Sequence, residues 1–187
     1  MACENRRRRG SASQSRRSIG AEHRLEAYAT LLLDVHGVRD LRASLAVHME
    51  TPALDTEVRV MFFDTDAGGL VHNIAYLRFI ETNRSLLAEK MGYPLVEMLD
   101  HGDCPVVVRT EIDYRRPARL WDTLLVHGEL EKFERSRFWC GFTITRPNDG
   151  QLLVTCRQML VVVRLPKLKV QRLPTHWETD FSHLKGN

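Results

Sequence analysis

The sequence predicts an α+β fold in which one antiparallel sheet folds around a single helix. Residues 57–63 form a strand-like run, and a helical pattern of about five turns follows over residues 73–91. Four more strand-like runs come next, joined by connections too short for crossover helices, so these strands are expected to be antiparallel neighbours. They cover residues 104–114, 123–133, 138–146 and 152–165. This order implies a five-stranded sheet around one helix.

The helix is expected to be buried, because apolar side chains surround most of its first half. These side chains are Ile74, Tyr76, Leu77, Phe79 and Ile80. Gly92 is the expected stop after the last turn, since glycine readily takes the left-handed conformation that ends helices. Pro94 then prevents the helix from continuing. The helix is therefore predicted to lie at the centre of the fold.

The strand-like runs differ in their patterns. Residues 57–63 begin with alternating charged and apolar residues and end with an apolar run, so we expect the rings of Phe62 and Phe63 to be buried. Residues 104–114 alternate, which predicts one face made of Val106, Val108, Thr110, Ile112 and Tyr114. The sequence PNDG at residues 147–150 predicts a tight turn between the last two strands.

The domain is expected to span residues 55–175, between an extension over residues 1–54 and a tail over residues 176–187. The extension is basic and is expected to be disordered at its start, because residues 1–24 hold seven of the 27 Lys and Arg residues and two of the 24 Asp and Glu residues. The rest of the chain has a net charge of −2, although the whole chain has +3. No nucleic-acid partner is predicted, because the body of the chain lacks a concentrated basic stretch.

Two classes of protein are disfavoured by composition. No apolar run approaches the roughly 20 residues that a membrane-spanning helix needs, so no membrane span is predicted. The four cysteines, Cys3, Cys104, Cys140 and Cys156, form no C-x-x-C pair, which argues against a zinc cluster. The last three lie among apolar residues in strand-like runs, where free cysteines are usually buried. Such thiols are typical of a reducing compartment, and we expect a cytoplasmic protein.

The sequence FFDTDAGGLVHN at residues 62–73 places Asp64 and Asp66 directly before Gly68 and Gly69. A calcium loop is excluded, because the fifth and twelfth positions of such a loop lack oxygen-bearing side chains here. A turn followed by a helix cap is one interpretation, since aspartate favours N-caps and glycine permits tight turns.

An apolar strand followed by Asp-x-Asp also resembles the haloacid-dehalogenase-type phosphatases. That resemblance implies that Asp64 attacks phosphorus, that Asp66 handles the proton of the leaving group, and that magnesium neutralises the phosphate. It further implies a parallel α/β sheet, which disagrees with the antiparallel order predicted above. A magnesium-dependent phosphatase is therefore the least favoured alternative.

A longer signature draws on more of the chain. Its residues are Asp66, Gly69, Val71, Asn73, Tyr76, Glu81 and Arg84, and it continues through residues 113–126 and 166–174. This signature resembles that of the hot-dog-fold acyl-CoA thioesterases, above all the Tol–Pal-associated thioesterases, relatives of the 4-hydroxybenzoyl-CoA thioesterases. The resemblance covers residues 57–175. It implies a hot-dog fold and the hydrolysis of an acyl-CoA thioester to a carboxylic acid and free coenzyme A.

The resemblance also implies roles for individual residues. In that family the acid at the position of Asp66 either attacks the thioester carbonyl or activates a water as a general base. The main-chain N–H of Asn73, at the helix N-terminus, would polarise the carbonyl. Substrate contacts are implied for Gly68, Gly69, His72 and Tyr76. No metal and no cofactor other than the coenzyme A thioester itself is implied, and Asp64 is left as a structural partner.

Two positions depart from the family pattern. Many relatives carry Tyr at the position of Phe62 and His at the position of Asn73, so a non-catalytic acyl-CoA or acyl-carrier binding protein on the same fold is the alternative function. The resemblance further implies a homodimer or homotetramer with sheets paired edge to edge. Candidates for binding the phosphates of coenzyme A are Arg109, Arg115, Arg116, Arg119, Arg137, Lys167 and Lys169.

Overall fold

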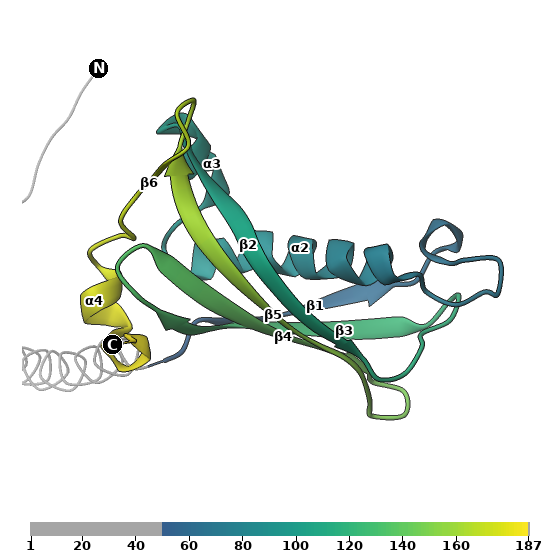
Figure 1. Cartoon of the computed structure of the whole chain (residues 1–187). Helices are drawn as coiled ribbons and strands as arrows, with labels where there is room; N and C mark the ends of the chain where they lie inside the picture. The colour runs from purple at the N-terminus through teal and green to yellow at the C-terminus, as the bar shows by residue number, and fades with distance from the viewer. Residues whose placement is uncertain (1–49, 187) are drawn as a thin grey trace, which may run out of the picture. The chain divides into compact units, whose positions relative to one another are not determined.

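The computed structural model describes residues 50–186, and it contains one sheet curled around one long helix (Figure 1). The strands are β1 (Ala53–Arg59), β2 (Asp103–Tyr114), β3 (Thr123–Phe133), β4 (Arg137–Arg146), β5 (Gln151–Arg164) and the short β6 (Lys169–Val170). The strand order is β1-β3-β4-β5-β2, with β6 paired to β5, and every pairing between these strands is antiparallel. The predicted α+β hot-dog architecture is confirmed. Residues 1–49, including Cys3 and most of the expected extension, lie outside the described residues.

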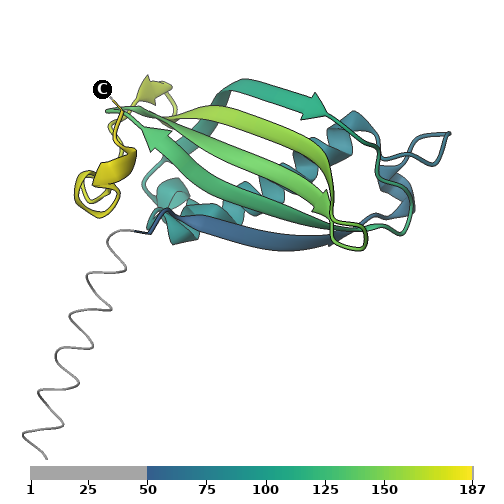
Figure 2. The same ribbon diagram turned by 90° about the horizontal axis from the view of Figure 1, so that it is seen from below.

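The central helix is α2 (Asn73–Lys90), and the prediction of a helix over residues 73–91 is confirmed. Figure 2 shows the strands lying across α2, with β1 and β2 at opposite edges of the sheet. The remaining helical segments are short: η1 (Phe62–Asp64), α3 (Leu95–Asp100), α4 (Trp177–Asp180) and η2 (Ser182–Leu184). No helix is predicted from the sequence over the residues that form α3.

The core lies between α2 and the concave face of the sheet. On β3 the side chains alternate between the two faces, and Leu124, Val126 and Leu130 are fully buried on the face toward α2. The helix contributes Ala75, Tyr76, Phe79, Ile80, Leu87 and Ala88. Removing this apolar surface from water is the main favourable term that holds the helix in the sheet.

The first strand ends earlier than predicted, and the burial of Phe62 and Phe63 was predicted wrongly. β1 stops at Arg59, and the two phenyl side chains lie on η1 with 78% and 67% of their surfaces exposed. Asp64 is buried instead, because it forms an ion pair with Arg78 of α2. Turning this carboxylate inward leaves the two preceding side chains on the outside of a short 3₁₀ turn.

The predicted face of the second strand is only half correct. The register between β2 and β5 shifts between Val107 and Arg109, so Val108 is the extra residue of a β-bulge. Val107 and Ile112 both pack against the core, whereas Val108 is 50% exposed. After the bulge, the side chains of β2 alternate between the two faces with the opposite parity. The residue pattern within the strand does not predict this change.

Asn83 connects the middle of α2 to two strands. Its side-chain amide donates to the carbonyl oxygens of Leu54 and Val126, each at 3.0 Å, and to the hydroxyl of Thr56 at 3.1 Å. The opposing residue on β3 is Gly128, where a Cβ atom would lie 2.0 Å from Asn83 Oδ1. Only glycine leaves room for this close approach of helix and sheet.

The segment after residue 175 packs against the domain. The side chain of Trp177 is fully buried, with its ring at right angles to those of Phe133 and Phe138 and its Nε1–H donating to the Met91 carbonyl at 2.9 Å. Such edge-to-face pairs add to the free energy of burial. The expected tail therefore contributes its tryptophan to the core at one end of the sheet.

The cysteines of the described residues are free thiols. Cys140 and Cys156 are buried, as predicted, and burial raises the pKa of Cys140 to about 12 and that of Cys156 to about 11. Neither is a thiolate at neutral pH, so neither is suited to nucleophilic chemistry.

Candidate active site

The loop before α2 holds Asp66 through its own backbone. The carboxylate oxygen Oδ1 of Asp66 accepts hydrogen bonds from the main-chain N–H of Gly68 at 2.8 Å and of Leu70 at 3.3 Å. The main-chain N–H of Asp66 donates to the Leu70 carbonyl at 2.8 Å. Gly69 closes the turn with a φ of 70°, a conformation that favours glycine. The second oxygen, Oδ2, has no partner among residues 50–186 and is left for a ligand or a water.

Asp64 has different surroundings. Its Oδ2 accepts the main-chain N–H of Met61 at 2.9 Å, its Oδ1 pairs with Arg78, and its carbonyl accepts the main-chain N–H of His72 at 3.0 Å. Asp64 thus connects η1 to Arg78 of α2 and to His72, the N-cap of that helix. This arrangement agrees with the predicted structural role of Asp64.

The N-terminus of α2 is open. His72 is the N-cap, and its Nδ1 accepts the main-chain N–H of Ala75 at 3.1 Å. No acceptor among residues 50–186 engages the main-chain N–H groups of Asn73 and Ile74. Free N–H groups and the helix dipole make this end of the helix favourable for negative charge.

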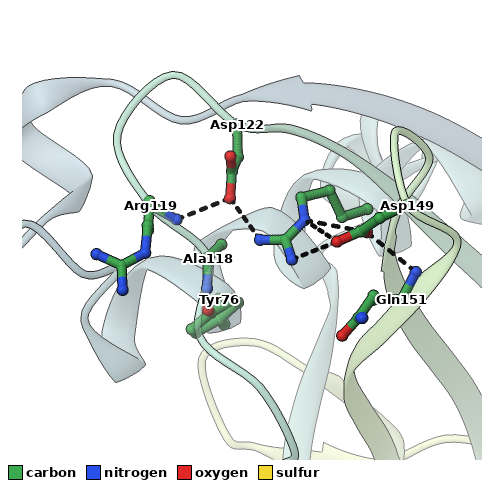
Figure 3. Close-up of polar contacts among 7 residues, drawn as sticks. Tyr76, Ala118, Arg119, Asp122, Asp149 and Gln151 are labelled. Carbon is green, nitrogen blue, oxygen red and sulfur yellow. Dashed lines mark hydrogen bonds and ion pairs between the residues drawn. The ribbon is translucent and has the colours of Figure 1, made fainter.

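Tyr76 connects the first turn of α2 to the segment between β2 and β3. Its hydroxyl oxygen accepts the main-chain N–H of Ala118 at 2.8 Å, a contact that Figure 3 shows. Burial raises the pKa of Tyr76, although this hydrogen bond opposes the rise. The side chain is therefore a neutral phenol at neutral pH.

An ion-pair network fixes the segment that carries Ala118. Asp122 Oδ2 accepts from the main-chain N–H of Arg119 at 2.9 Å and from Arg146 at 3.0 Å, and Arg146 also pairs with Asp149 at 2.7 Å (Figure 3). Hydrogen bonds to Asp149 and Asp122 raise the pKa of Arg146 above its usual range. The network joins the segment after β2 to the turn between β4 and β5.

A cleft of about 400 Å³ lies where these parts meet. It is lined by Asp66, Leu70, Val71, His72, Asn73, Tyr76, Tyr114, Arg115, Arg116 and Pro117. Four of the six predicted site residues thus share one cleft, while Gly68 and Gly69 form the adjoining turn and do not line it. Of the seven basic candidates, Arg115 and Arg116 line the cleft.

Two uncharged cleft residues from the end of β2 and the segment after it, Tyr114 and Pro117, were not predicted from the sequence as site residues. The Tyr114 hydroxyl lies 3.4 Å from the Asn73 carbonyl, and its ring centroid is 5.7 Å from that of Tyr76. The curl of the sheet brings the residues that follow β2 close to the N-terminus of α2. The nearest available signal was the signature itself, which continues through residues 113–126.

The last two residues of the signature, Glu81 and Arg84, lie in the middle of α2. Arg84 pairs with Glu81 one turn away and donates to the side-chain oxygen of buried Gln158 on β5. Neither Glu81 nor Arg84 lines the cleft. Arg84 connects the helix to β5, whereas the side chain of Glu81 is 58% exposed and pairs with Arg84 on the helix.

Within residues 50–186, no three His, Cys, Asp or Glu side chains lie close enough together to hold a metal ion. No helix in this part of the chain is long and apolar enough to cross a membrane.

Known proteins share this sequence pattern. The sequence model of the thioesterase-like superfamily matches residues 60–181. The acyl-CoA thioesterase YbgC of Haemophilus influenzae is 30% identical over 129 residues, which are 68% of this chain and 93% of that protein. The 1,4-dihydroxy-2-naphthoyl-CoA hydrolase of Synechocystis is 28% identical over 129 residues, which are 68% of this chain and 94% of that protein.

A solved structure shares the fold. Slr0204, a 1,4-dihydroxy-2-naphthoyl-CoA thioesterase from Synechocystis, aligns with a TM-score of 0.63 and 26% identity, covering 71% of this chain and 97% of that one. The family match spans most of the described residues and includes the whole cleft. The chain belongs to the thioesterase-like superfamily and is a thioester hydrolase.

Proposed function

We propose that the protein hydrolyses acyl-CoA thioesters to a carboxylic acid and free coenzyme A, with Asp66 as nucleophile or general base and the helix N-terminus at Asn73 polarising the carbonyl. One observation carries this proposal: Asp66 and Asn73 line one cleft, and neither Oδ2 of Asp66 nor the main-chain N–H of Asn73 has a hydrogen-bond partner among residues 50–186. The relatives named as acyl-CoA and naphthoyl-CoA hydrolases support the choice of thioester.

In the general-base route, Asp66 takes a proton from water while the water oxygen bonds to the carbonyl carbon. In the nucleophilic route, the Asp66 carboxylate bonds to that carbon and a mixed anhydride forms, which water then hydrolyses. In both routes the C–S bond breaks, and coenzyme A leaves as a thiolate that gains a proton. Both routes develop negative charge on the carbonyl oxygen, which the N–H of Asn73 would stabilise. Neither route uses a metal or another cofactor.

Other residues have supporting roles in the proposal. Gly68 and Gly69 shape the turn that presents Asp66, and His72 and Tyr76 contact the substrate from the helix. Arg115 and Arg116 line both the cleft and a second pocket beside the turn between β4 and β5, and there they would contact the phosphates of coenzyme A.

The phosphatase interpretation does not fit the fold. It needs a parallel sheet, whereas the strands here pair antiparallel. It also needs Asp64 to attack phosphorus, but that carboxylate is buried and engaged by Met61 and Arg78. The non-catalytic binding protein keeps the same cleft and is separated from the hydrolase by turnover.

A thiol-release assay tests the proposal. With a panel of short, long and aryl acyl-CoA thioesters, the wild-type chain is expected to release coenzyme A from at least one member. Asp66→Asn is expected to lower kcat by about a thousandfold or more, because the amide is neither a base nor a nucleophile. No release by the wild type from any member of the panel would support the binding protein instead.

Heavy-oxygen water separates the two routes. In a single turnover with enzyme in excess, the general-base route places the label in the carboxylic acid. In the nucleophilic route, attack of water on the Asp66 carbonyl carbon leaves the acid unlabelled and labels Asp66, which mass spectrometry of a digest detects.

A further inference from the structure

The imidazole of His72 has one nitrogen engaged and one free. Nδ1 accepts the main-chain N–H of Ala75, and an accepting nitrogen in a neutral ring carries no proton. The proton of the neutral ring is therefore on Nε2. Among residues 50–186, Nε2 has no hydrogen-bond partner, and the side chain lines the cleft.

A histidine is an unusual choice if capping is the whole task. Serine, threonine, aspartate and asparagine are the favoured N-caps and use a short side chain. His72 performs the cap with one edge of its ring and presents an N–H donor on the other edge. A neutral imidazole at a helix N-terminus is suited to polarising a carbonyl group.

The position of the ring decides which group it meets. Because His72 caps the third residue of α2, its ring lies beside the helix end whose first N–H groups, at Asn73 and Ile74, are free. A carbonyl oxygen bound to the Asn73 N–H would lie next to this ring. Asp66 lines the same cleft, so attack on the carbonyl carbon and donation to its oxygen come from within one site.

We propose that His72 is a second donor to the thioester carbonyl oxygen, through Nε2–H, acting together with the main-chain N–H of Asn73. This inference rests on the proposed hydrolase function and assigns the oxyanion site two donors: one from the backbone and one from a side chain. In this role His72 donates a hydrogen bond and keeps its proton, and Asp66 alone takes the proton of the water or attacks the carbon.

The test uses variants that keep the cap and lose the donor. His72→Ser retains an oxygen that accepts the Ala75 N–H, and so does His72→Asn, whose side chain is shorter than the imidazole. Both are expected to melt within about 2 °C of the wild type. Their kcat is expected to fall by about tenfold to a hundredfold, with KM changed by less than about threefold. His101→Ser is the matched control, because His101 is exposed beside α3 and does not line the cleft.

Two unreactive ligands separate a carbonyl donor from a purely structural role. An S-(2-oxoalkyl)-coenzyme A keeps a carbonyl group, and the S-alkyl-coenzyme A of the same length lacks it. His72→Ser is expected to weaken binding of the first by about tenfold and of the second by less than twofold. Equal weakening of both ligands, or of neither, would overturn the assignment.

The outcomes also separate this inference from the function beneath it. If the wild type releases coenzyme A and the capped variants keep kcat within twofold of it, the second donor is wrong and the hydrolase remains. If the wild type releases none from the whole panel, the proposed function itself fails.

Discussion

Asp64 and Asp66 stand two residues apart in the loop before α2, and the first is buried whereas the second is exposed. The carboxylate of Asp64 is engaged by Met61 and by Arg78, which lies fourteen residues further along the chain. Within residues 50–186, the carboxylate of Asp66 is engaged only by the turn that it begins, and only at one oxygen. Asp64 is engaged at both oxygens and anchors the loop, whereas Asp66 keeps one oxygen for the role proposed above.

We predict that Asp64→Asn lowers the free energy of unfolding by about 1–3 kcal/mol. The amide keeps the shape and an acceptor for Met61 but leaves Arg78 without its charged partner, and the exposure of Arg78 limits the loss. Urea unfolding followed by circular dichroism measures the change.

Asp66→Asn is the matched control for this stability measurement. Its amide oxygen still accepts from Gly68, so its free energy of unfolding is expected to stay within about 0.5 kcal/mol of the wild type. Equal losses for the two variants would contradict the anchoring role of Asp64.

Single residues of the site were predictable where a local pattern carried them. Asp66, His72, Asn73 and Tyr76 fall within eleven consecutive residues, and all four line the cleft. Tyr114 lies 38 residues beyond Tyr76, and its place in the cleft depends on how far the sheet curls. The exposure of Phe62 was missed for a related reason: the inward turn of Asp64 is set by its distant partner, Arg78.

At the scale of the elements, α2 fixes the site because its N-terminus meets the segment after β2. The hydrogen bond from Ala118 to Tyr76 and the pairing of Val71 N with Ala118 O hold that segment against the helix end. Asn83 holds the middle of the same helix to β1 and β3. The helix is therefore attached to the sheet by polar contacts as well as by its apolar face.

The pair of β2 and β5 gives a pH prediction. Arg164 on β5 donates to Asp103 on β2, at 3.0 Å from Nη2, and this hydrogen bonding holds the pKa of Asp103 below its usual range. The pKa of an aspartate in an unfolded chain is about 3.9. Because the folded pKa is lower, the stabilisation is complete above the unfolded pKa and is lost as pH falls through the folded pKa.

We therefore expect the wild type to exceed Asp103→Asn in free energy of unfolding by about 1–2 kcal/mol at pH 6, since Arg164 is half exposed. The difference should shrink as the pH falls below about 4. Urea unfolding from pH 3 to 7 measures it, with Asp100→Asn as a control on exposed α3. A difference that stays constant to pH 3 would contradict the role of the carboxylate charge.

Elements were predictable where their own periodicity defined them. The helix began at the predicted residue, and β3 matched its predicted bounds at both ends. The bulge at Val108 could not be predicted, because it arises from the pairing of β2 with β5 across the sheet. The six residues of α3 carry too few turns for a helical period to stand out from the surrounding glycines and proline.

At the scale of the whole molecule, the sheet formed by residues 50–186 has two edge strands, β1 and β2. An unpaired edge offers its N–H and C=O groups to another strand. We predict a homodimer or homotetramer that pairs through β2, the longer of the two edges with twelve residues against seven. Light scattering after size exclusion is expected to give at least twice the mass of one chain.

Val108→Glu tests which edge pairs. Val108 on β2 and Val170 on β6 are about equally exposed, at 50% and 51%, so Val170→Glu adds the same charge at a matched site. The Val108 variant is expected to shift toward the monomer and the Val170 variant to keep the assembly. A Val108 variant with unchanged mass would exclude β2 as the paired edge.

The bulge at Val108 also bears on whether this protein forms fibrils in concentrated solution. It divides the edge of β2 into two stretches, residues 103–107 and 109–114, which no straight, uninterrupted strand can follow for its full length. Fibril growth needs flat edges that add identical strands without limit. A kinked edge favours a partner with a matching kink, which a second copy of the same strand supplies, and it discourages the stacking of unfolded segments. We therefore expect Val108, the residue that breaks the alternation of β2, to disfavour amyloid-like polymerisation.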